Sequence, residues 1–325
     1  MIVPYYWSQS KVKKVVNGQQ FTVMRFGWSD ESEEAAKQLA DSRLAEAIQT
    51  LESEGDVRRI DRKVSYNGSE GVPIREEVIE KIDDIVISRN AYGALCLNTP
   101  DVLFADIDFD QEAAFSTIVI SGILVLLMSI LTAVITGYVW IFILGLFLSL
   151  LFASPLATLF FNLKLKLTGG VEKSRLQAIE KASAAYPTLH MRVYRTPNGF
   201  RVLIMNDTFS PTSEETVQLL KSLNSDSVYI QMCKNQKCFR ARISPKPWRI
   251  GVERLKPRPG IWPIKPEKLA ERERWVRSYE HRSRNIASCH FVMSLGSDDV
   301  HQKAERVQQI HDEKCLAMKT DLPLA

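Results

Sequence analysis

The sequence predicts an α+β soluble domain that carries an inserted two-helix transmembrane hairpin. Three observations predict this class. Residues 113–163 contain no charged side chain, although 25% of the chain is charged. Strand-like and helix-like patterns are mixed on both sides of that run. Several strand pairs are joined by short turns, which is typical of α+β proteins.

The N-terminal part opens with a predicted β-hairpin. Residues 13–16 and 21–26 are strand-like, and Asn17-Gly18 between them tolerates the positive φ of a tight turn. A helix capped by Ser29 or Asp30 then runs to about Leu51. Further elements are expected as a short helix at 74–82 and strands at 84–88 and 102–106.

The uncharged run is long enough for two membrane spans. A spanning helix needs about 20 apolar residues, so we expect spans at about Phe115–Thr136 and Val139–Phe160. Gly137 stands at the turn between them, and Tyr138 and Trp140 beside it suit the water–lipid interface. A soluble apolar core is the alternative, but the run leaves no polar face for water. The lipid bilayer is therefore an expected partner.

Flanking charge predicts the orientation of the two spans. The turn carries no Lys or Arg, whereas the second span is followed by Lys164, Lys166, Lys173 and Arg175. Positive residues near span ends favour the cytoplasmic side. We therefore expect a multi-pass protein with both termini in the cytoplasm.

After the spans the sequence again mixes both element types. We expect helices at 171–185, 213–223, 268–284 and 299–313, and strands at 189–196, 200–206, 228–232, 238–243 and 286–293. The predicted division is 1–112 and 164–260 as the two halves of one cytoplasmic α+β domain, 113–163 as the hairpin, and 261–325 as a basic helix, strand and terminal helix. Two separate soluble domains are the alternative.

Charge is distributed unevenly along the chain. Residues 1–112 hold 13 Lys and Arg against 21 Asp and Glu, whereas residues 234–284 hold 16 against 5. The basic block suggests a phosphate-rich partner such as nucleic acid, nucleotide or anionic lipid. Alternatively, its acids pair with basic neighbours along a solvated helix. The five cysteines show no regular spacing, which favours reduced thiols over a zinc site.

A pair of acids follows the apolar strand at 102–106. Side chains two apart in a strand share a face, so Asp106 and Asp108 lie on one side. Carboxylates in this arrangement suit Mg²⁺ or Mn²⁺, which prefer oxygen ligands. A polar strand end or an acidic loop beside the membrane is the alternative interpretation.

Five basic residues are candidates for phosphate binding. The turn at Pro197-Asn198-Gly199 brings Arg195 and Arg201 near each other, where they face an anion or balance the acids. Arg240 and Arg242 share one face of the expected strand at 238–243. Lys246 lies between two prolines, and Trp248 beyond it either stacks on a base or packs in the core.

In the order of these parts the chain resembles the archaeo-eukaryotic primase superfamily, particularly its primase–polymerase branch. Asp106 and Asp108 match that family's strand-borne acidic pair. Asp226-Ser227-Val228-Tyr229 through Phe239-Arg240 is similar to its later Asp and basic strand. The resemblance covers about 90–110 and 170–250, and implies Asp106, Asp108 and Asp226 as metal ligands. Arg201 stands where the family has a phosphate-handling His, which puts polymerase activity in doubt.

The whole chain also resembles uncharacterised bacterial membrane proteins. The likeness lies in stretches such as Asn98-Thr99-Pro100-Asp101-Val102-Leu103-Phe104 and Pro245-Lys246-Pro247-Trp248-Arg249. It implies the bacterial inner (cytoplasmic) membrane as the location and indicates no activity.

Two functions remain open from the sequence. One is a membrane-anchored cytoplasmic protein with a primase-like domain that binds nucleotide or nucleic acid, with catalysis undecided. The other is a non-catalytic membrane protein whose basic surface binds anionic lipid or a protein partner. The relation of Asp226 to Asp106 and Asp108 in the fold separates the two.

Overall fold

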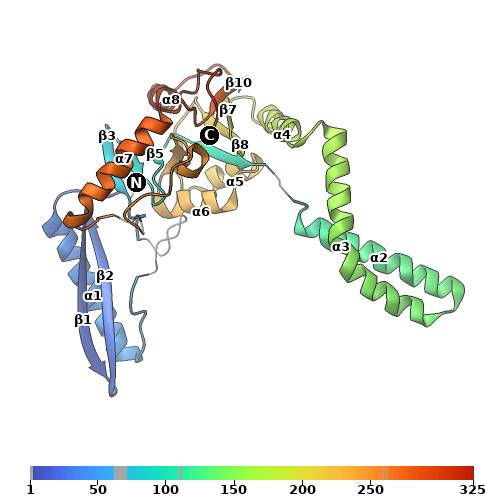
Figure 1. The fold of residues 1–325 in the computed structure, drawn as a ribbon, viewed down its shortest axis with the longest axis horizontal. Helices are drawn as coiled ribbons and strands as arrows, with labels where there is room; N and C mark the ends of the chain where they lie inside the picture. The colour runs from blue at the N-terminus through green and yellow to red at the C-terminus, as the bar shows by residue number, and fades with distance from the viewer. Residues whose placement is uncertain (1–2, 62–71, 110–111, 259, 261) are drawn as a thin grey trace. The chain divides into compact units, whose positions relative to one another are not determined.

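The computed structural model describes the chain except for residues 1–2, 62–71, 110–111, 259 and 261. It divides into two compact units. The first comprises 1–107, 183–197 and 201–325, and the second comprises 108–182 and 198–200. The protein is a mixed α+β protein, as the sequence predicts, and Figure 1 shows its elements in chain order.

The first unit begins with a long β-hairpin covered by a helix. Strands β1 (Tyr6–Val16) and β2 (Gln19–Ser29) pair antiparallel through Asn17-Gly18, both at positive φ, which confirms the predicted turn. Helix α1 (Glu33–Glu54) is capped by Ser32, and its buried side packs on Phe21 and Val23 of β2. Gly27 permits this close packing, because a Cβ there would overlap the backbone of α1.

A four-stranded antiparallel sheet follows in the order β3-β4-β5-β9. Its strands are β3 (Glu77–Ile82), β4 (Ile85–Arg89), β5 (Leu95–Thr99) and β9 (Phe239–Arg242). In the register, Asn98 of β5 lies opposite Arg240 of β9. The sheet therefore joins segments from before and after the apolar run.

A second four-stranded sheet has the order β10-β7-β8-β6. Its strands are β6 (Phe104–Asp108), β7 (His190–Thr196), β8 (Gly199–Ile204) and β10 (His290–Gly296). Every residue of β8 is buried, which is the pattern of a strand covered on both faces. The charged side chain of Arg201 consequently lies inside the protein.

Four helices complete the first unit. They are α5 (Glu214–Ser222), α6 (Ser227–Gln236), α7 (Leu269–Ser283) and α8 (Gln302–Cys315). Short 3-10 turns at Pro247–Ile250 and Pro266–Lys268 precede α7. Trp275 and Tyr279 of α7 stack with ring centroids 5.0 Å apart in a small core with Ile250, Val252 and Leu255.

The second unit holds helices α2 (Phe115–Thr136), α3 (Val139–Thr168) and α4 (Val171–Ala185). By length and composition, α2 and α3 could each cross a membrane, and very few of their side chains are buried. The two helices lie side by side (Figure 1), with Gly145 of α3 against Ser129 of α2. A core helix of a soluble protein would instead be mostly buried.

Two predicted elements are wrong. The helix expected at 74–82 is strand β3, because Asp83 at positive φ closes a two-residue turn and lets residues 77–82 pair with β4. The strand expected at 228–232 is helix α6. Its start is fixed by Asp226, whose side chain accepts hydrogen bonds from the first free N–H groups of the helix.

Candidate ligand-binding site

The first residue of the predicted acidic pair, Asp106, forms an ion pair with Arg201. Asp106 of β6 accepts a hydrogen bond from Nε of Arg201 at 3.1 Å, and Nη1 of Arg201 donates to the carbonyl of Arg242 at 2.8 Å. Burial alone would lower the pKa of Arg201, but the Asp106 carboxylate and other nearby groups raise it above its ordinary value. A permanent cation therefore already balances the Asp106 carboxylate.

The other two predicted metal ligands lie differently. The carboxylate of Asp226 accepts from the N–H groups of Val228 and Tyr229, each at 3.2 Å, while its own N–H donates to the Asp106 carbonyl at 3.0 Å. Asp108 is exposed at the end of β6. Asp226 thus adjoins Asp106 through the backbone, and its carboxylate caps α6. Binding of Mg²⁺ or Mn²⁺ by these three residues stays a prediction.

The five predicted phosphate-binding residues have different partners in the structure. Nη2 of Arg240 donates to both carboxylate oxygens of Glu76, at 2.7 and 2.6 Å, and both side chains are buried. Arg201 and Arg242 meet through the carbonyl described above, and Arg195 lies opposite His290 at the β7–β10 pairing. Lys246 lies over the ring of Trp248, which is 46% exposed. Arg201 and Arg240 are thus already paired with carboxylates, and binding of a phosphate by the five residues stays a prediction.

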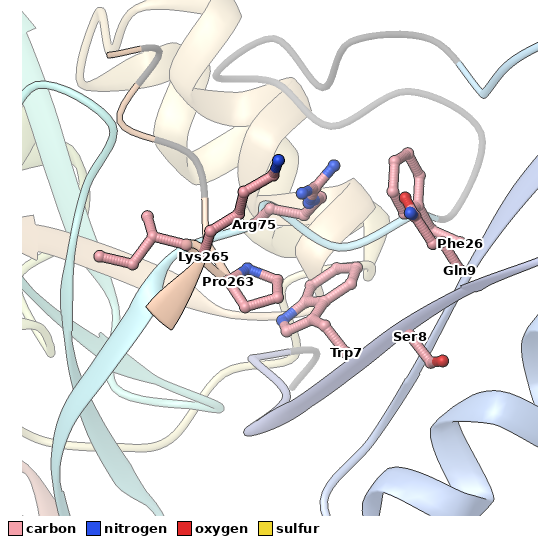
Figure 2. A pocket seen from close by; sticks show the side chains of 8 residues that line it. Trp7, Ser8, Gln9, Phe26, Arg75, Pro263 and Lys265 are labelled. Carbon is pink, nitrogen blue, oxygen red and sulfur yellow. The ribbon is translucent and has the colours of Figure 1, made fainter. Parts of the chain in front are cut away.

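A pocket that the sequence did not indicate lies at the N-terminal hairpin (Figure 2). It has a volume of about 440 Å³, which falls within the usual range for small-molecule sites. Its walls come from one end of β1 and β2, from the segment before β3 and from the chain before α7. The lining residues are Trp7, Ser8, Gln9, Phe26, Arg75, Pro263, Ile264 and Lys265.

Arg75 is the central charged group of this pocket. Its guanidinium lies 4.1 Å from the centroid of the Phe26 ring and 5.9 Å from that of Trp7, and its Nε donates to the carbonyl of Trp262 at 2.8 Å. In the described part of the chain, no carboxylate forms an ion pair with it. Burial lowers the pKa of Arg75 to about 10, so the group stays protonated at neutral pH.

This arrangement favours an anion. A charge that is partly removed from water is costly unless an opposite charge compensates it. The aromatic rings offset part of that cost by cation–π attraction, which is worth about 0.5–2 kcal/mol. The two Nη groups remain as a planar fork that suits a carboxylate or a phosphate.

The surroundings of the pocket are also positive. A neighbouring hollow of about 400 Å³ shares Arg75 and the segment 263–265 and adds Arg258 and Lys268 to its lining. Its one acid is Glu267, which lies 3.9 Å from the ammonium group of Lys265. The two hollows together present three further cations and one carboxylate around Arg75.

Apolar groups form the rest of the wall. Trp7 is 7% exposed, and its indole N–H has no hydrogen-bond partner among the described residues. In Figure 2 the side chains of Trp7 and Pro263 lie below the guanidinium of Arg75, and the ring of Phe26 lies to its right. Flat aromatic and proline surfaces of this kind stack well on a planar group. The pocket therefore combines a cation with a stacking surface.

A second feature could hold a metal ion. In the part of the chain that the structure describes, Cys289, His311 and Cys315 form a buried group whose donor atoms lie within 4.8 Å of one another. The irregular cysteine spacing gave no sign of it. The only local signal is the spacing of four between His311 and Cys315.

Comparison with models of known families, with curated proteins and with solved structures finds no match to this chain.

Proposed function

We propose that this chain is a membrane-anchored binding protein whose α+β domain takes up a small anionic ligand with a planar apolar group, of which a nucleoside phosphate is one chemical class. The observation that carries this proposal is Arg75, a stacked and partly buried guanidinium without a carboxylate partner in the described structure. The ligand's anionic group would pair with Arg75, and its flat part would stack on Trp7 and Pro263.

The positions of the acidic residues support a binding role over a polymerase role. Phosphoryl transfer uses carboxylates that are free to hold metal ions. Here the Asp106 carboxylate is engaged by Arg201, and that of Asp226 caps a helix. The primase-like resemblance then concerns the scaffold, and the ligand is taken up on a different face, between the N-terminal hairpin and the segment before α7.

The membrane anchor is the second part of the proposal. The exposed apolar surfaces of α2 and α3 are accounted for if both helices cross the bilayer as a hairpin, because lipid then covers them. Lys164 and Lys166, near the end of α3, support a cytoplasmic position for that end by the positive-inside rule. On this proposal the ligand is cytoplasmic, and the bacterial inner membrane is the location.

Titration calorimetry on the detergent-solubilised full chain tests the pocket. We expect AMP to bind, and inorganic phosphate and adenosine each to bind at least tenfold more weakly, because each offers half of the contacts. Arg75→Met should weaken AMP binding roughly 10- to 100-fold, the value of one or two charge-assisted hydrogen bonds. Arg75→Lys should retain part of the affinity, since it keeps the charge and loses the fork.

Arg277→Met is the matched control. Arg277 is an exposed arginine on α7 that pairs with Glu273, away from the pocket lining. AMP affinity should be unchanged in this variant. Equal AMP binding by wild type and Arg75→Met would overturn the proposal, as would an absence of binding by all three probes.

A second candidate function rests on Trp248. This exposed ring has Lys246 at 5.6 Å and Arg254 at 5.2 Å from its centroid. An exposed aromatic ring with two cations beside it suits an anionic membrane surface. The soluble part would then bind vesicles containing phosphatidylglycerol and not vesicles of phosphatidylcholine alone, and Trp248→Ala with Lys246→Gln would remove the difference. Equal binding to both vesicles would exclude this candidate.

A further inference from the structure

A buried group of metal-type donors joins β10 to α8. Cys289 precedes β10 directly, and His311 and Cys315 lie four residues apart on α8. Residues with this spacing share one helix face, so α8 presents both donors toward the end of β10. All three side chains are buried, with at most 1% of their surface exposed.

The distances between the donors suit a zinc ion. Sγ of Cys289 lies 3.8 Å from Nε2 of His311, and the three donor atoms all lie within 4.8 Å of one another. Zinc bonds of about 2.3 Å to sulfur and 2.0–2.1 Å to nitrogen place such a pair about 3.6 Å apart in a tetrahedron. Small side-chain movements would therefore complete three of the four bonds.

The orientation of His311 is fixed from its other side. Nδ1 of His311 lies 3.0 Å from Oδ1 of Asp312, and the other carboxylate oxygen, Oδ2, accepts a hydrogen bond from Nη2 of Arg192 at 2.9 Å. A carboxylate that accepts the Nδ1–H leaves the Nε2 lone pair facing the cysteines. This is the carboxylate–histidine arrangement found behind metal-bound histidines.

The charged groups around the three donors are compatible with a bound Zn²⁺ ion. Nη1 of Arg201 lies 3.3 Å from Nε2 of His311, so the metal would replace a long contact. Arg201 keeps its bonds to Asp106 and to the Arg242 carbonyl. Two thiolates and one neutral imidazole around Zn²⁺ carry no net charge, so the cation of Arg201 does not oppose the bound site.

We propose that Cys289, His311 and Cys315 bind one Zn²⁺ ion that ties α8 to the sheet, with water or a backbone carbonyl as fourth ligand. Binding releases the two thiol protons to solvent. The site is independent of the ligand pocket at Arg75. Because all three donors are buried, its role is structural: without the ion, α8 is held less firmly against β10.

Metal analysis of the tag-free full chain tests the proposal. Mass spectrometry of the purified protein should find about one zinc per chain, and titration with a mercurial reagent should release it as the thiols react. Replacement by Co²⁺ should give the thiolate charge-transfer and intense d–d absorption of a tetrahedral site. These measurements use the wild-type protein and do not depend on the folding of any variant.

Variants then locate the site. Cys315→Ser and His311→Gln should each reduce bound zinc at least tenfold. Asp312→Asn should weaken binding 10- to 100-fold, as expected when the group orienting a ligand is lost. Cys233→Ser is the control, because Cys233 is an equally buried thiol on α6 and should leave the zinc content unchanged.

Two results would overturn the proposal. One is purified wild-type protein that contains no zinc and takes up none when it is dialysed against a zinc solution. This result includes protein that holds a disulfide between Cys289 and Cys315, and protein that binds copper but not zinc. The other is zinc that stays at full occupancy in a folded Cys289→Ser, Cys315→Ser double variant.

Discussion

Replacing Asp106 by Asn distinguishes a structural ion pair from a metal site. The guanidinium of Arg201 is 2% exposed and would lose its carboxylate, while its bond to the Arg242 carbonyl remains. Breaking a fully buried pair costs about 3–5 kcal/mol and a surface pair about 0–1 kcal/mol. Because the side chain of Asp106 is 38% exposed, an intermediate loss of about 2 kcal/mol is expected.

Thermal unfolding of the detergent-solubilised chain measures this loss. For a domain of this size, about 2 kcal/mol corresponds to a decrease in Tm of roughly 4–8 °C. Asp298→Asn is the control, because Asp298 is an exposed carboxylate away from β6 and its loss should change Tm by less than about 2 °C. Arg201→Met combined with Asp106→Asn should recover part of the loss, since no charge is then left unpaired.

A contrary result has a clear form. If Mg²⁺ or Mn²⁺ raises the Tm of the wild type, and Asp106→Asn abolishes that rise while stabilising the metal-free protein, then the carboxylates repel each other and share an ion. The structural interpretation of the Arg201 pair would then be wrong, and the predicted metal site of Asp106, Asp108 and Asp226 would be supported.

Three other predictions concern different parts of the chain. Glu76→Gln should destabilise the protein by about 3–5 kcal/mol, measured by thermal unfolding, because it leaves the buried Arg240 without its counter-charge. Burial raises the pKa of Tyr279 to about 12. The neutral hydroxyl of Tyr279 therefore contributes fully to stability below pH 10, and this contribution is lost as the pH rises through 12. A titration of tyrosine absorbance should show an ionisation step near pH 12 in the wild type that is missing in Tyr279→Phe. Gly27→Ala should loosen the N-terminal hairpin, seen as faster amide hydrogen exchange in α1, because the added Cβ overlaps the carbonyl of Ala36.

Elements set by local chemistry could be predicted from the sequence. Asn17-Gly18 specified the first hairpin, and the uncharged run gave α2 with the bounds Phe115 and Thr136 that the structure has. The sequence predicts a strand at 228–232, where the structure has a helix, because Val, Tyr and Ile favour strands in general. The capping bonds of Asp226 and the hydrogen bond from the Tyr229 hydroxyl to the Phe104 carbonyl outweigh that preference.

The candidate site was harder to predict because its contacts are long-range. The sequence left open whether Arg201 faces an anion or balances the acids, and the structure pairs it with Asp106, which lies 95 positions earlier in the chain. Arg75 meets the carbonyl of Trp262 across 187 positions, and neither residue belongs to a recognisable motif. Pairings of this kind depend on how the two four-stranded sheets pack, which short sequence patterns do not encode.

The pairing of β5 with β9 has a consequence for biosynthesis. Cys96 lies opposite Arg242, and Lys314 of α8 reaches Glu80 across 234 positions. During synthesis, α2 and α3 therefore emerge from the ribosome long before the residues that complete the two four-stranded sheets. An anchor would be handed to the insertion machinery while the first 107 residues still expose the edge of β5. Such an unfinished edge is prone to wrong pairing, so we expect the nascent chain to depend on chaperones until α8 has emerged.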